Sequence, residues 1–290
     1  MKKSRKLATL GICSALFLGL AACQQQHATS EGTNQRQSSS AKVPWKVSYT
    51  NLNNQVSTEE VKSLLSAHLD PNSVDTFFNL VNDYNTIVGS TGLSGDFTSF
   101  THTEYDVEKI SHLWNQKKGD FVGTNCRINS YCLLKNSVTI PKLEKNDQLL
   151  FLDNDAIDKG KVFDSQDKEE FDILFSRVPT EATTDVKVHA EKMETFFSQF
   201  QFNEKARMLS VVLHDNLDGE YLFVGHVGVL VPADDGFLFV EKLTFEEPYQ
   251  AIKFASKEDC YKYLGTKYAD YTGEGLAKPF IMDNDKWVKL

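Results

Sequence analysis

The sequence predicts an α+β fold in which a helical N-terminal half packs on a C-terminal antiparallel sheet. Apolar residues recur at helical spacing through the first half of the chain. The last third instead alternates short β-branched or aromatic runs with turn residues. Helices followed by strands are typical of α+β domains, and we detect no internal repeat. We therefore expect one α+β domain over residues 43–290.

The helices are predicted in chain order from their caps and apolar faces. Ser57 and Glu60 have the spacing of a capping box, and Asp70-Pro71-Asn72 ends the helix that this box begins. Residues 149–152 are compatible with either a strand or a helical turn. The other predicted helices cover residues 74–87, 105–118, 126–135, 168–177, 186–200 and 257–268.

The strands are predicted as an antiparallel meander because short turns separate them. These turns include Asp218-Gly219, Asp234-Asp235-Gly236 and Glu247-Pro248. The predicted strands cover residues 208–213, 221–231, 237–245 and 251–254, with a final strand within 280–290.

The first 23 residues carry the features of an export signal. A basic start precedes an apolar stretch at residues 7–20, which is shorter than the roughly 20 residues of a spanning helix. Leu20-Ala21-Ala22-Cys23 follows, and the whole segment resembles a bacterial lipoprotein signal peptide with its lipobox. The resemblance implies cleavage after residue 22, acylation of Cys23 by fatty acid such as palmitate, and an extracytoplasmic location at the cell membrane. The alternatives are an ordinary secretory peptide and an N-terminal anchor helix.

Charge and composition limit the possible partners. Without residues 1–22 the chain has 27 Lys/Arg and 40 Asp/Glu, a formal charge of −13. Such an acidic chain argues against nucleic acid as a partner and against electrostatic adhesion to anionic lipid. Residues 24–42 contain almost nothing apolar, so we expect residues 23–42 to be a lipidated, disordered tether. The expected membrane contact is the lipid on Cys23.

Three cysteines follow the tether, which is an odd number for an exported protein. Thr124 or Asn125 is a natural N-cap and would place Cys126 in a first helical turn, where free amides and the helix dipole stabilise a thiolate. Arg127 adds positive charge beside it. The alternative is that Cys126 is a small buried apolar residue, as we expect for Cys132 and Cys260.

His226 and Glu241 are the candidate partners of the thiol. His226 interrupts an apolar strand, and we expect Gly225 and Gly228 to leave open space beside its ring. Counting outward from a turn centred near residue 234 places His226 opposite residue 241 or 242. Glu241 lies on an otherwise apolar face and needs a partner. The alternative pairs Glu241 with a lysine and leaves His226 as a hydrogen-bonded core histidine.

Other polar clusters give weaker signals, and we expect neither a metal nor a cofactor. His214, Asp215 and Asp218 could touch a metal at a strand end, but the chain has no zinc-type spacing. The acidic run after residue 152 lacks the glycine and the terminal glutamate of a calcium loop, so we interpret it as a solvated face. Its members are Asp153, Asp155, Asp158 and Asp164.

Residues 121–135 and 221–245 together resemble the papain-like superfamily, in particular its NlpC-type peptidoglycan peptidases and amidases. The resemblance consists of a cysteine at a helix start, with Asn125 before it, and the run His226-Val-Gly-Val on a later strand. The chain departs from that branch in having Arg127-Ile128 after the cysteine, and Glu241 as the third residue. Over its whole length the chain also resembles an uncharacterised firmicute lipoprotein family with an Asn-Cys-Arg motif.

These expectations define two functions. The first is a membrane-anchored cysteine hydrolase or acyl transferase of the cell envelope, acting on amide bonds. Cys126 would attack the carbonyl, His226 would move the proton, Glu241 would hold the ring, and Asn125 or the helix amides would bind the oxyanion. The resemblance implies peptidoglycan or a peptide as substrate. The second is a non-catalytic surface lipoprotein that binds a peptide, glycan or protein partner on a decayed hydrolase scaffold.

Overall fold

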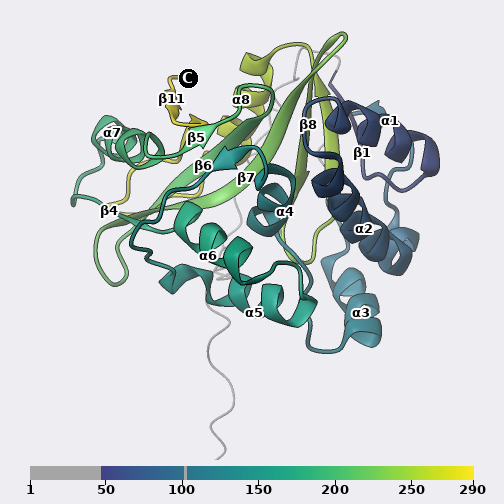
Figure 1. The fold of residues 1–290 in the computed structure, drawn as a ribbon. Coiled ribbons are helices and arrows are strands. Elements are labelled where there is room, and N and C mark those ends of the chain that lie inside the picture. Colours follow the sequence, from purple (N-terminus) through teal and green to yellow (C-terminus); the bar gives the residue numbers. More distant parts are fainter. Residues whose placement is uncertain (1–46, 101–102) are drawn as a thin grey trace, which may run out of the picture. The chain divides into compact units, whose positions relative to one another are not determined.

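The computed structural model describes residues 47–100 and 103–290, which belong to one compact unit, Pro44–Leu290. The signal peptide, Cys23 and the tether expected at residues 1–42 lie outside the described residues. Helices and an antiparallel sheet make up the described part, which confirms the predicted α+β class (Figure 1). In this part of the chain, no helix has both the length and the apolar character needed to cross a membrane.

Most helices agree with the expected ones in place and differ at their ends, but the helix over residues 151–160 was not predicted beyond a possible helical turn at 149–152. Residues 149–152 are helical, and the first helix is capped by Asn54, whose side chain accepts a hydrogen bond from Ser57 N. The predicted capping box at Ser57 is therefore wrong, because Asn54 supplies the cap three residues earlier. The α-helices are α1 (Gln55–Ser66), α2 (Pro71–Val88), α3 (Val107–Lys118), α4 (Cys126–Leu134), α5 (Phe151–Gly160), α6 (Ser165–Leu174), α7 (Val186–Phe197) and α8 (Lys257–Lys267), with 3-10 turns η1 (Gly89–Thr91) and η2 (Gln148–Leu150).

The strands form the predicted meander and extend it. Residues 280–288 form a hairpin of two strands instead of one, because Asn284 turns the chain in the left-handed region at φ 54°. The strands are β1 (Ser48–Thr50), β2 (Thr98–Ser99), β3 (Val138–Thr139), β4 (Val178–Pro179), β5 (Gln201–Phe202), β6 (Arg207–Asp215), β7 (Tyr221–Ala233), β8 (Gly236–Lys242), β9 (Tyr249–Phe254), β10 (Phe280–Asp283) and β11 (Lys286–Val288).

The main sheet has two buried faces. Among the described residues its strand order is β11-β10-β6-β7-β8-β9-β1-β2, and β4 pairs with the start of β7. Neighbouring pairs of residues on β7 and β8 face opposite sides of the sheet. Val229 and Val240 pack on the side of α2 and α4, whereas Leu230 and Phe239 pack on the side of α8. Helices therefore cover both faces, as Figure 1 shows for α4 and α8.

Candidate functional site

Cys126 is the first residue of α4, as the sequence predicts. Asn125 is the N-cap in an extended conformation, and its Oδ1 accepts a hydrogen bond from Ile128 N at 3.1 Å. The first N–H groups of a helix have no acceptor within that helix. Because Asn125 satisfies Ile128, the N–H groups of Cys126 and Arg127 are left at the helix tip beside the sulfur. This tip carries the positive end of the helix dipole.

A gap in the sheet brings α4 to β7. On one side of β7, pairing with β4 ends at Leu222 and pairing with β8 begins at Val229. Side chains of α4 bond the β7 carbonyls in between: Arg127 Nη1 donates to Val224 O at 3.0 Å, and Ser130 Oγ donates to Val227 O at 3.2 Å. The start of α4 thus takes the place of a strand along this part of β7.

A β-bulge at Gly225 sets the direction of His226. In the pairing of β6 with β7, Val211 faces His226 whereas Val212 faces Val224, so Gly225 is the extra residue. A bulge shifts the alternation of side chains by one residue. His226 therefore points to the face covered by α8, although Val224, two residues earlier, points to the face covered by α4.

His226 and Glu241 are in direct contact. His226 Nε2 and Glu241 Oε2 are 2.5 Å apart, and both side chains are almost completely buried. The predicted register is wrong by one to two residues, because the turn is Asp234-Asp235 alone and Val229 pairs with Val240. Continuing this register, the residue opposite Glu241 is Gly228. His226 reaches the carboxylate diagonally from the next position on the same face.

The two glycines beside His226 do not leave the expected open space. A Cβ at Gly225 would overlap the side chain of Leu213, and one at Gly228 would overlap the ring of Phe239. Neighbouring apolar side chains fill both positions. The glycines therefore serve close packing and the bulge rather than substrate room.

Helix α8 and its C-cap residue Tyr268 supply three partners that sequence reasoning missed. Tyr263 donates to Glu241 Oε1 at 2.5 Å, and Lys267 Nζ lies 3.3 Å from the same oxygen. The Tyr268 ring stacks on the His226 imidazole at a centroid distance of 4.9 Å and an angle of 23°. Tyr263 and Lys267 are four residues apart, which places them on one helix face. This i, i+4 spacing was the feature of the sequence that could have indicated a shared contact of Tyr263 and Lys267.

These contacts fix the charge of Glu241. Burial acts to raise the pKa of the carboxyl, but Lys267, His226 and Tyr263 outweigh it and lower the pKa to about 2. An ionised Glu241 accepts a hydrogen bond from His226 Nε2. The other ring nitrogen, Nδ1, is then the one free to face the sulfur.

Cys126 and His226 lie close enough that each shifts the pKa of the other. Burial acts to raise the pKa of the thiol, yet His226 and Arg127 outweigh it and hold this pKa below its usual value. Burial acts to lower the pKa of the imidazole, yet Cys126 and Glu241 raise it. Both directions favour a thiolate paired with an imidazolium.

The other two described cysteines lack this environment. Burial raises the pKa of the Cys132 thiol to about 12 and that of Cys260 well above its usual value. All three cysteines are unpaired and buried. Cys126 retains 5% of its surface exposed, whereas the other two have 0%. Among the three described cysteines, only Cys126 has partners that lower the pKa of its thiol, and only Cys126 keeps some residue surface exposed.

Arg127 ties the tip of α4 to α5 as well as to β7. It forms a bidentate pair with Asp153, at 2.9 Å through Nε and 2.7 Å through Nη2. Asn125 Nδ2 also donates to Asp153 Oδ1 at 2.7 Å, so both ends of the Asn125 side chain are engaged. The expectation that Asp153 belongs to a solvated face is wrong. This carboxylate is fully buried because two donors from the Asn-Cys-Arg segment pair with it.

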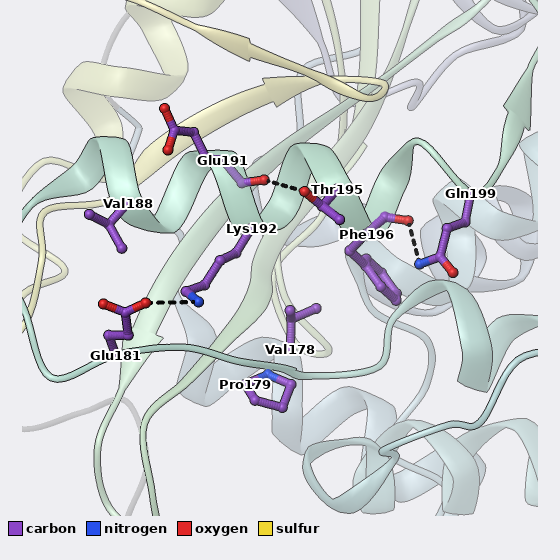
Figure 2. A pocket seen from close by; sticks show the side chains of 9 residues that line it. All are labelled: Val178, Pro179, Glu181, Val188, Glu191, Lys192, Thr195, Phe196 and Gln199. Atoms are coloured by element: carbon purple, nitrogen blue, oxygen red, sulfur yellow. Dashed lines mark hydrogen bonds and ion pairs between the residues drawn. The ribbon is translucent and has the colours of Figure 1, made fainter.

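The described surface also holds two grooves away from Cys126, His226 and Glu241. One, of about 520 Å³, lies between α7 and the segment that begins with β4 (Figure 2). Figure 2 shows Lys192 of α7 reaching Glu181 of that segment, an ion pair of 3.1 Å. The other groove, of about 410 Å³, lies between α1 and α2. Within residues 47–100 and 103–290, no group of three His, Cys, Asp or Glu residues is arranged to hold a metal ion.

The fold and the site define an α+β protein with a buried cysteine, histidine and glutamate brought together from a helix and two strands. Comparison with family profiles matches residues 48–288 to DUF4300, described as a domain of unknown function. The chain belongs to this family. Neither the curated proteins nor the solved structures give a match.

Proposed function

We propose that this protein is a lipid-anchored cysteine hydrolase or acyl transferase of the cell envelope, with Cys126 as nucleophile, His226 as base and Glu241 as the residue that orients the base. The observation that carries the proposal is the direct contact of the imidazole with an ionised, buried carboxylate, together with the mutual pKa shifts of that imidazole and the thiol. Nucleophilic catalysis by cysteine needs these three functions in this order.

The chemical steps follow from the positions of the proton. His226 Nδ1 holds the proton of the thiol, and the sulfur attacks the carbonyl carbon of an amide. The carbon–sulfur bond forms, the carbon–nitrogen bond breaks, and the imidazolium returns the proton to the leaving amine. A thioester remains on Cys126. Water, activated by His226, hydrolyses it to the acid, or an amine takes the acyl group.

Backbone amides are the best donors for the oxyanion of this reaction. The Asn125 side chain already caps α4 and bonds Asp153, so its amide is engaged. The N–H groups of Cys126 and Arg127 project from the tip of α4 beside the sulfur. A helix tip offers these donors in a fixed orientation, which is the requirement for stabilising developing negative charge.

The location and the substrate class of the proposal come from the sequence. The lipobox-like segment at residues 20–23 supports a lipid anchor on Cys23 at the outer side of the membrane. The papain-like, NlpC-type arrangement that the Asn125-Cys126 and His226 segments resemble indicates peptidoglycan stem peptides as substrate.

Competitive alkylation tests the activated thiol. Native protein is treated with limiting iodoacetamide at neutral pH, and the modified peptides are quantified by mass spectrometry. We expect Cys126 to react at least tenfold faster than Cys132 and Cys260, because the thiolate is the reacting form. Glu220→Gln is a control variant, in which Cys126 should keep its wild-type reactivity, since Glu220 bonds His214 at 2.7 Å outside the site. Equal reactivity of the three thiols would remove the basis of the proposal.

Turnover tests the reaction itself. Wild type and Cys126→Ala are incubated with peptidoglycan fragments and with synthetic stem peptides, and new amino and carboxyl groups are measured. We expect product with wild type and none with the variant. A folded wild type that alkylates rapidly but cleaves and transfers nothing contradicts the enzymatic proposal.

A second candidate function is the binding of a partner without catalysis. The groove between α7 and the segment after β4 favours it, because Val178 and Phe196 present apolar surface there beside the Lys192–Glu181 ion pair. Peptide or glycan binding that survives Cys126→Ala and is lost on Phe196→Glu supports this function. Binding lost in Cys126→Ala alone supports the enzyme.

A further inference from the structure

Lys242 is a buried cation that the reaction described above does not use. It follows Glu241 on β8, and its side chain is almost fully enclosed, with 1% of the residue exposed. No carboxylate among the described residues lies within ion-pair distance of its Nζ. A buried charge without a counter-ion is costly, so something else in its surroundings must stabilise it.

Backbone carbonyls and aromatic faces form its immediate surroundings. Lys242 Nζ donates to Thr244 O at 2.8 Å, to Phe245 O at 3.2 Å and to Glu247 O. Three acceptors match the three N–H bonds of an ammonium group. The Tyr84 ring lies 4.1 Å from Nζ, measured to the ring centroid, and the negative face of an aromatic ring favours a cation.

The alternation of β8 directs Lys242 toward the side from which the thiol comes. Glu241 shares a face with Phe239, which packs with α8, whereas Lys242 shares a face with Val240, which packs with α4. The second aromatic ring near Nζ is that of Tyr249, whose side chain also contacts residues at the start of α4. Its hydroxyl bonds Asn129 Oδ1 at 3.0 Å and lies 3.3 Å from Thr124 Oγ1.

We propose that Lys242 is a positioning residue for the reaction, which holds a positive charge behind α4 and thereby stabilises the Cys126 thiolate. The inference rests on the proposed function and adds a fourth ionic group to it. Strand β8 thus carries one charged residue for each member of the ion pair. Glu241 lies beside the His226 imidazolium, and Lys242 lies on the side of the sheet that faces the Cys126 thiolate.

Burial lowers the pKa of Lys242 to about 7, whereas Glu246, Glu247 and the Cys126 thiolate act to raise it. The ammonium form therefore predominates only below about pH 7, and its effect on the thiolate is expected in that range. The charged groups that act on the Cys126 thiol itself include His226, Arg127 and Asp153.

The test is the pH dependence of Cys126 alkylation, measured from pH 4 to 9. Lys242→Met removes the charge, whereas Tyr84→Phe removes the hydroxyl that donates to Glu246 O in the same loop and keeps the charge. We expect Lys242→Met to raise the apparent pKa of alkylation by about one unit, which is a typical effect of one nearby unit charge in a protein. At pH values below the wild-type midpoint, Lys242→Met should be alkylated about tenfold more slowly than the wild type. Lys242→Arg and Tyr84→Phe should keep the wild-type midpoint.

A reciprocal measurement covers the case in which Lys242→Met does not fold. The Nζ signal of Lys242 is followed by NMR in lysine-labelled wild type and Cys126→Ser. By linkage, loss of the thiolate should lower the pKa of the Lys242 ammonium by the same amount. An unchanged Lys242 titration, or an equal shift of alkylation in Tyr84→Phe, overturns the inference. Neither result touches the proposed function, which fails separately if Cys126 of the wild type is unreactive.

Discussion

Replacing Glu241 with glutamine is expected to remove a pH-dependent part of the stability of this protein. Glu241 is fully buried and bonds His226, Tyr263 and Lys267. Glutamine has nearly the same shape but carries no charge. It also brings an NH₂ group, which must face either the imidazole N–H or the side of Tyr263 and the Lys267 ammonium, both of which donate to Glu241. The variant therefore loses the ionic interactions and gains a conflict between donors.

The magnitude follows from the pKa of the carboxyl. The interval between its ordinary pKa of 4.5 and the value of about 2 in the fold corresponds to about 3 kcal/mol. Because the pKa is lowered in the folded state, this stability is fully present above about pH 4.5. It is lost as the pH falls from there to about 2. The raised pKa of His226 acts in a different window, near and above its usual value of 6.5.

The assay is urea unfolding of wild type and Glu241→Gln at a series of pH values from 7 to 2. We expect the variant to be less stable by about 3 kcal/mol or more at pH 7. The difference should shrink by about 3 kcal/mol between pH 4.5 and 2, since the wild type alone loses the charge. Glu220→Gln serves as a control for removing a carboxylate that bonds a histidine elsewhere. A difference between wild type and Glu241→Gln that stays constant over the whole range refutes the reasoning.

Three further substitutions test how the tip of α4 and the bulge are built. Asn125→Ala should cost about 1 kcal/mol in urea unfolding through loss of the cap, and more because Asp153 loses a donor. Arg127→Lys keeps the charge but loses the bidentate pair, so we expect stability to fall by about 1–3 kcal/mol and Cys126 alkylation to slow severalfold; unchanged rates contradict the linking role. Gly225→Ala should cost about 1–3 kcal/mol in thermal unfolding, since its Cβ would overlap Leu213; a neutral effect would mean that the bulge can move.

Sequence patterns predicted the parts of the fold that depend on local chemistry. The start of α4 follows from an asparagine cap before an apolar helical pattern, and both are local properties of the chain. Strands β6–β9 follow from apolar runs between turn residues. The common face of His226 and Glu241 was also predicted, although the exact register was not. A shift of one residue in a turn moves every pair beyond it.

The missed residues depend on tertiary contacts that have no local signal. Asp153 lies in an acidic run, and only the arrival of Asn125 and Arg127 from another helix explains its burial. Tyr263 and Lys267 come from a helix that packs on the opposite face from α4. The bulge at Gly225 is invisible in the alternation of an almost wholly apolar strand. Each case requires knowledge of which elements meet in space.

The site depends on an interruption of the sheet rather than on the sheet itself. A continuous ladder between β7 and β8 would separate a thiol on the α4 face from an imidazole on the α8 face by the thickness of the backbone. Here the ladder begins only at Val229, and the bulge at Gly225 turns His226 at the same place. The tip of α4 enters this opening and bonds the free carbonyls of β7. The gap, the bulge and the Arg127 contact to β7 therefore act together to bring Cys126 to His226. Disrupting any of them should separate the sulfur from the ring without removing either residue.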